Sequence, residues 1–94
     1  MQKIIDISNY KENLLMLERA SWEKECREEL LAFLVNQGLI QSDDYTRLWE
    51  EYLIAYANYQ KEKDNFFQTV VINFLNENYK IWEVQYNEEV LILK

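Results

Sequence analysis

Residues that break helices are almost absent from this sequence. Its 94 residues include no proline and one glycine, Gly38. Proline and glycine are the strongest interruptions of regular structure, so their scarcity favours long helices joined by few loops. A chain of this length makes one domain, which we take to span residues 1–94.

The stretch from Asn9 to Gln37 has the pattern of a first helix. Ser8 or Asn9 is its expected N-cap. Gly38 is expected to adopt the left-handed conformation of a Schellman motif at its end. The apolar pattern shifts phase near Ala20, so the helix either bends there or rotates its buried face. Apolar residues recur at Tyr10, Leu14, Leu17, Trp22, Cys26, Leu30, Phe33 and Leu34.

An aromatic stripe organises a second helix, which begins at Ser42. Ser42 is a favourable N-cap, and Asp43 and Asp44 suit the first turn of a helix. The short linker Gly38–Gln41 makes this helix an antiparallel neighbour of the first. We expect the rest of the chain to pack against the stripe, which lies on one side of a helix. Its members are Tyr45, Trp49, Tyr52, Tyr56, Tyr59, Phe66 or Phe67, Val70 and Phe74.

The stripe is interrupted at residues 61–65. The helix either continues straight through this segment, or Asp64 caps a third helix over Phe66 to Asn78. We favour the break, because a small domain gains burial when its chain folds back on itself.

After Asn78 the apolar period changes from 3.6 to 2, which indicates a β-hairpin. With a two-residue turn at Asn87-Glu88, Val84 would face Leu91 and Trp82 would face Leu93. The Ile-rich residues 1–7 are the expected third strand. The predicted class is α+β and mainly helical: an antiparallel helical hairpin or three-helix cluster, with a small antiparallel sheet from the N-terminal strand and the C-terminal hairpin.

The side chains needed for catalysis are scarce. The sequence has no histidine, which removes Ser-His and Cys-His pairs and most transition-metal sites. One glycine cannot build a phosphate-binding loop. We therefore predict no enzyme, no cofactor and no metal. The single cysteine, Cys26, is interpreted as a buried structural thiol, and Trp22, Trp49 and Trp82 are assigned to packing.

The formal net charge is −7, which opposes direct binding to nucleic-acid phosphates. The longest apolar run, Leu30 to Val35, is far shorter than a membrane span, and the N-terminus lacks the pattern of a signal peptide. We therefore expect a cytoplasmic protein without a membrane partner.

These features favour a small acidic protein-binding module. In its concrete form it is an inhibitor, of the kind made by phages and mobile elements, that occludes a basic nucleic-acid-binding surface of a larger protein. The alternative is an accessory or assembly subunit, or a homodimer, that uses the Tyr-rich helix face and the edge of the C-terminal strand Val90–Leu93. A third hypothesis makes the aromatic stripe the wall of a small-molecule or catalytic pocket. The candidate partner-binding residues are Glu25, Glu28, Glu29, Glu50, Glu51, Tyr52, Tyr56, Glu88 and Glu89.

Overall fold

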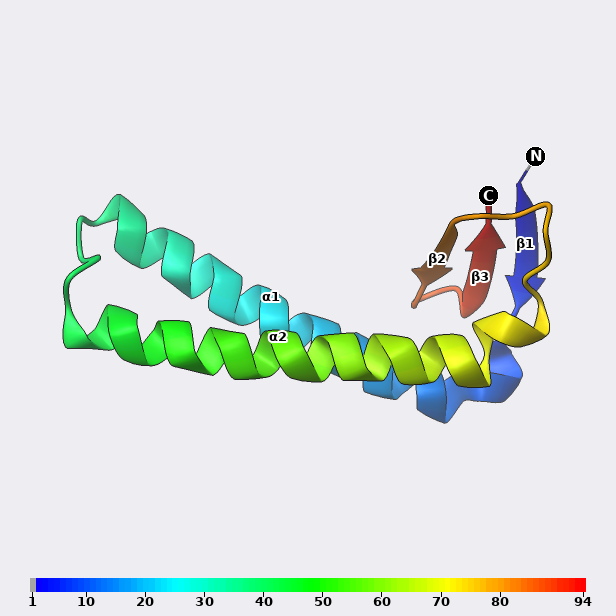
Figure 1. Cartoon of the computed structure of the whole chain (residues 1–94), viewed down its shortest axis with the longest axis horizontal. Helices are drawn as coiled ribbons and strands as arrows, with labels where there is room; N and C mark the ends of the chain where they lie inside the picture. Colours follow the sequence, from blue (N-terminus) through cyan, green and yellow to red (C-terminus); the bar gives the residue numbers. More distant parts are fainter. Residues whose placement is uncertain (1) are drawn as a thin grey trace.

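The computed structural model describes residues 2–94, and it has an elongated shape of 47 × 25 × 23 Å. Two long helices, α1 and α2, form an antiparallel hairpin, and a three-stranded sheet packs at its open end, where both chain termini lie (Figure 1). The predicted α+β class is confirmed, with the hairpin rather than a three-helix cluster. The elements are β1 (Lys3–Asp6), a 3₁₀ turn (Ser8–Tyr10), α1 (Lys11–Asn36), α2 (Asp43–Thr69), a second 3₁₀ turn (Val71–Asn73), β2 (Trp82–Gln85) and β3 (Val90–Leu93).

The sheet is antiparallel, with strand order β1-β3-β2. Trp82 pairs with Leu93 and Val84 with Leu91, so the predicted hairpin register is confirmed. On its other side β3 pairs with β1, where Ile5 lies opposite Leu91. β3 is therefore the central strand. The apolar run Val90–Leu93 fitted either a strand buried on both sides or a free edge: the first interpretation is confirmed and the second is wrong. Its apolar character on both faces reflects burial of Leu91, Ile92 and Leu93.

The two ends of α1 are capped differently: the predicted side-chain cap is absent at its start, and the predicted Schellman motif is present at its end. The predicted caps Ser8 and Asn9 lie in the 3₁₀ turn, and α1 begins without a side-chain cap. The Ser8 amide instead donates a 2.9 Å hydrogen bond to the Asp6 carboxylate. At the other end Gly38 has φ +72°, and the Leu39 amide donates to the Leu34 carbonyl at 2.9 Å. The predicted Schellman motif is confirmed.

α2 begins as expected, continues past the predicted break at Asp64, and ends at Thr69, before the predicted helical limit at Asn78. The Ser42 hydroxyl accepts a 3.1 Å hydrogen bond from the Tyr45 amide, which confirms the cap. The helix then runs unbroken through residues 61–65, so the favoured break at Asp64 is wrong. The lysine and glutamate residues there are good helix formers, and the segment contains no proline or glycine that would interrupt the helix. The predicted helix over Phe66 to Asn78 is also wrong: α2 ends at Thr69, where a β-branched run, residues 69–72, lowers helix propensity.

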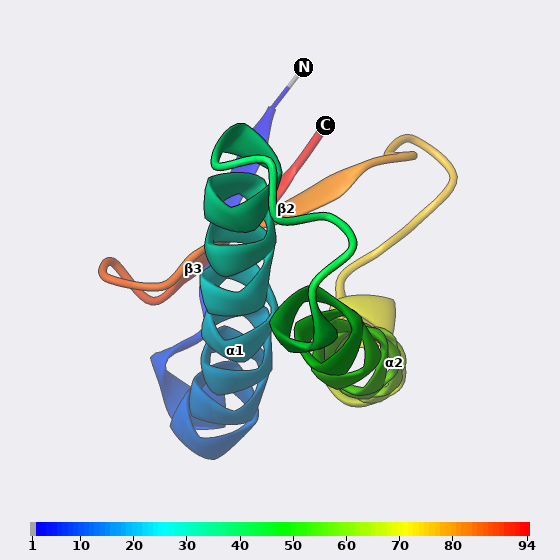
Figure 2. The same cartoon turned by 90° about the vertical axis from the view of Figure 1, so that its left-hand side faces the viewer.

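The main hydrophobic core lies at one end of the molecule, between the sheet and the open end of the hairpin. Its fully or almost fully buried members are Ile7, Leu14, Leu17, Phe66, Val70, Val71, Leu91 and Leu93. Toward the connecting loop only Leu31 and Ala55 are buried, and the two helices diverge (Figures 1 and 2). The half of the hairpin away from the sheet therefore has little interior of its own.

The apolar residues of α1 fall on two opposite faces rather than on one. Leu17, Ala20 and Leu31 are buried, whereas Trp22 is 62% exposed. Trp49 of α2 is 44% exposed, so the assignment of Trp22 and Trp49 to packing is wrong. Two helices bury one stripe each against one another, and a second stripe on the outside of α1 has nothing to cover it among residues 2–94.

Candidate protein-binding surface

One side of α2 presents a row of aromatic rings, which we call the aromatic face: Trp49, Tyr52, Tyr56 and Tyr59. The ring centroids of Trp49 and Tyr52 are 5.5 Å apart, and those of Tyr52 and Tyr56 are 6.0 Å apart. Tyr52 and Tyr59 are half-buried toward α1, while Trp49 and Tyr56 remain 44% and 42% exposed. Steps of three and four residues place these rings on one side of the helix. The predicted stripe thus exists, but part of it faces solvent.

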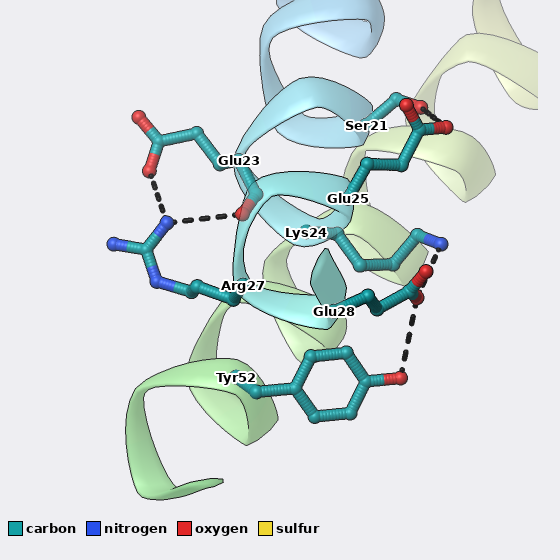
Figure 3. Close-up of polar contacts among 7 residues, drawn as sticks. All are labelled: Ser21, Glu23, Lys24, Glu25, Arg27, Glu28 and Tyr52. Atoms are coloured by element: carbon teal, nitrogen blue, oxygen red, sulfur yellow. Dashed lines mark hydrogen bonds and ion pairs between the residues drawn. The ribbon is translucent and has the colours of Figure 1, made fainter. Parts of the chain in front are cut away.

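Tyr52 connects the aromatic face to α1 (Figure 3). Its hydroxyl donates a long, 3.4 Å hydrogen bond to Glu28, which also pairs with Lys24 at 2.9 Å. This bond with Glu28 holds the pKa of Lys24 above its ordinary value. Partial burial, with the Glu28 charge, raises the pKa of the Tyr52 phenol. The Tyr52 hydroxyl therefore stays protonated at neutral pH and remains a donor.

Lysine side chains cover the last ring of the aromatic face. The ammonium group of Lys24 lies 5.0 Å from the centroid of the Tyr59 ring, and that of Lys63 lies 6.0 Å from it. Lys63 is also 5.9 Å from the Trp82 ring centroid. Cations at these distances are attracted by the ring faces. The rings of this surface can therefore hold positively charged groups.

Beyond Tyr59 the aromatic face enters a cleft between the hairpin and β2. The cleft has a volume of about 410 Å³ and is lined by Leu17, Tyr59, Lys63, Lys80, Ile81, Trp82, Glu83, Val84 and Tyr86. Burial, with smaller contributions from Tyr59 and Glu18, raises the pKa of Tyr86 to about 12. Tyr59 belongs to the predicted aromatic stripe, whereas Lys24 and Lys63 were not predicted to be part of this surface. The i,i+4 spacing of Lys24 and Glu28 was a visible signal for one of them.

The nine predicted partner-binding residues do not form one surface. Glu25 and Glu28 point from α1 toward the side where the Tyr52 hydroxyl lies, and Arg27 with Glu23 points to the other side (Figure 3). Tyr56 belongs to the same side through its contact with Tyr52. Four of the nine residues, Glu25, Glu28, Tyr52 and Tyr56, are therefore brought together.

The remaining five candidates lie elsewhere. Glu51 lines a shallow hollow with Arg27 and Ile54, and Glu50 is exposed on the outside of α2. Glu29 is exposed one turn beyond Glu25 on α1. The last two, Glu88 and Glu89, lie in the β2–β3 connection, which Figure 2 shows on the side of α1 away from α2.

Glu89 has a backbone role in that connection. It has a left-handed φ of 54°, and its carbonyl accepts a 2.9 Å hydrogen bond from the Ile7 amide. This bond ties the turn of the C-terminal hairpin to the end of β1, so Glu89 contributes to the sheet whatever its carboxylate does.

The remaining features of the described residues concern metal binding, the free cysteine and membrane spanning. Within residues 2–94, no three His, Cys, Asp or Glu side chains lie close enough together to hold a metal ion. Cys26 is half-buried rather than buried as predicted. In the same range, neither helix contains a segment that combines the length and hydropathy required to cross a bilayer. Comparisons of the chain with protein-family models, with curated proteins and with solved structures find no match.

Proposed function

We propose that this chain is a non-enzymatic protein-binding module that contacts a basic surface of its partner through the aromatic face and the adjoining carboxylates of α1. The observation that carries the proposal is the partly exposed ladder of Trp49, Tyr52 and Tyr56 beside Glu25 and Glu28. Tyrosine and tryptophan are rigid and amphipathic, so they lose little entropy on binding and are enriched in binding hot spots.

The chemistry of this face favours arginine or lysine on the partner. A guanidinium group can stack on a tyrosine or tryptophan ring while it pairs with a carboxylate. Lys24 and Lys63 already lie over the Tyr59 ring within the chain, which is the same type of contact. With a net charge of −7, the module fits a partner whose contact surface is basic, such as the nucleic-acid-binding surface of a larger protein.

The contact we propose is mixed rather than purely electrostatic. Several carboxylates are already paired within the chain, such as Glu28 with Lys24 and Glu23 with Arg27. Screening by salt weakens exposed charge pairs but leaves ring burial almost unchanged. Binding should therefore weaken with salt without disappearing.

The experiment compares three double variants for capture of a partner from a lysate of the source organism, with titration of the purified partner. Trp49→Ala with Tyr56→Ala removes exposed rings, and Glu25→Gln with Glu28→Gln removes the neighbouring charges. Both should weaken binding at least tenfold. The matched control, Glu50→Gln with Ile54→Ala, changes two exposed positions of α2 away from the aromatic face and should bind as the wild type does. A partner that binds all three variants equally would overturn the proposal, provided circular dichroism shows each variant folded.

A further inference from the structure

The outside of α1 carries a long row of mostly exposed side chains. Leu15, Trp22 and Phe33 are 53%, 62% and 56% exposed. Helical spacing places them on the side of α1 opposite Leu17 and Leu31, which are buried. In Figure 2, α2 lies along one side of α1, and the β2–β3 turn projects on the other.

The row has the spacing of a coiled-coil seam. We call it the outer stripe, and it consists of Leu15, Arg19, Trp22, Cys26, Glu29 and Phe33. Its steps alternate between four and three residues, which is the heptad pattern that lets two helices pack along their length. Arg19 stands four residues from one end of the stripe and Glu29 four residues from the other.

We propose that the outer stripe binds the outer stripe of a second copy of this chain, with the two α1 helices antiparallel. In this register Leu15 meets Phe33 of the second copy and Trp22 meets Cys26 of the second copy. Arg19 meets Glu29 of the second copy. Each of these three residue pairs occurs twice, because a two-fold axis relates the two copies. Every apolar residue of the stripe therefore meets an apolar residue, and both charges are paired.

Charge selects this arrangement over the parallel one. In a parallel dimer Arg19 would face Arg19 and Glu29 would face Glu29, and like charges at such positions are unfavourable. Within residues 2–94, neither Arg19 nor Glu29 takes part in an ion pair, and Arg19 borders a shallow hollow that Glu23 and Glu62 also line. In the proposed dimer the Arg19 side chain pairs with Glu29 of the second copy.

The size of the stripe is close to what a specific interface requires. From Leu15 to Phe33 it is about 27 Å long at the usual helical rise. The exposed fractions of its three large apolar residues and of neighbouring Leu30 correspond to roughly 450 Å² per copy, since one aromatic side chain contributes about 200 Å². Complete burial in two copies would remove at most about 900 Å² of apolar surface from water, and the charged side chains add to this, so the total approaches the ~1,000 Å² expected of a specific interface.

The test is a set of charge exchanges read out by sedimentation equilibrium. The wild type should have the mass of two chains. Arg19→Glu places carboxylates opposite one another, and Glu29→Arg places cations opposite one another, so each variant should dimerise at least tenfold more weakly. The double variant Arg19→Glu with Glu29→Arg should recover the dimer, and an equimolar mixture of the two single variants should form a heterodimer. Glu50→Arg on α2 is the control and should leave the mass unchanged.

A disulfide experiment fixes the direction of the helices. In a Cys26→Ser background, Leu15→Cys with Phe33→Cys should give an oxidised dimer whose cross-links join position 15 of one copy to position 33 of the other. The same two positions are about 27 Å apart within one helix, so they cannot bond within one chain. Links of 15 to 15 and 33 to 33, or a single-chain wild-type mass at millimolar concentration, would overturn the proposal.

Discussion

The indole of Trp82 in β2 stacks on the ring of Phe66 in α2, with centroids 5.8 Å apart and planes inclined by 25°. Phe66 is 1% exposed and belongs to the main hydrophobic core. The pair joins the sheet to the helical hairpin, together with the contact between Phe67 and the same Trp82 ring and the other apolar residues of the core. The stability of the whole domain should therefore depend on it.

Truncation of Phe66 should be among the most destabilising changes in the chain. Phe66→Ala should lower the free energy of unfolding by about 3–5 kcal/mol, because it removes a buried ring and leaves a cavity. Phe66→Leu should cost less, which keeps the measurement possible if the alanine variant is unfolded. Urea denaturation followed by tryptophan fluorescence gives both values. Ile54→Ala, at a position 73% exposed, should change stability by no more than about 0.5 kcal/mol; equal effects at the two positions would contradict this core.

Tyr86 should make the protein less stable at high pH. Burial raises the pKa of its phenol to about 12, whereas an unfolded tyrosine titrates near pH 10. The folded state keeps the proton that the unfolded chain releases, so the free energy of unfolding falls as pH rises from about 10 to about 12. Because the side chain is only half-buried, the loss should not exceed about 2 kcal/mol. Urea midpoints across this range should fall less for Tyr86→Phe than for the wild type, and parallel curves would show that Tyr86 is not responsible.

Gly38 should tolerate substitution poorly for a purely conformational reason. A Cβ atom at this position would meet no other atom within 4 Å, but φ is +72°. A side chain in the left-handed region costs about 1–2 kcal/mol. Gly38→Ala should lower the melting temperature by several degrees, and Gly38→Asn, which tolerates this conformation better, should lower it less. If both variants melt with the wild type, the Schellman ending of α1 is not formed in solution.

The N-cap of α2 should contribute to the free energy of unfolding independently of the main hydrophobic core. Ser42→Ala removes the acceptor of the Tyr45 amide and should cost about 1 kcal/mol. Ser42→Asp keeps an acceptor and should retain most of the stability. Chemical denaturation of the two variants distinguishes loss of the cap from a general effect of substitution in the connecting loop, because only the alanine variant should be destabilised.

Local patterns predicted the parts of the fold that depend on neighbouring residues. The Gly38 ending, the Ser42 cap and the Trp82–Leu93 register each involve segments close in sequence, and all three are confirmed. The break at Asp64 was favoured on a general argument about burial. The unbroken helix shows that good local helix formers prevail there, because the sheet covers the core without a third helix.

The candidate surface was predictable only along one helix at a time. Tyr52 and Tyr56 share a side of α2 by spacing alone, and their proximity follows from it. Whether Glu25 and Glu28 of α1 lie beside them depends on how α1 crosses α2, which no local pattern encodes. The exposure of Trp22 has the same origin: two helical apolar stripes on α1 are visible in the sequence, but the position of α2 decides which one is buried.

The central place of β3 has a consequence for the order of folding. β1, near the start of the chain, has β3 as its only neighbour in the sheet, and Lys3 pairs with Leu93. Contacts within the helical hairpin form between segments close in sequence, whereas this pairing must close a loop that contains both long helices. As the chain is synthesised, β1 therefore stays without a partner until β3 has left the ribosome. The sheet should form in the slow, final step, after the hairpin has shortened the distance that the two ends must cross.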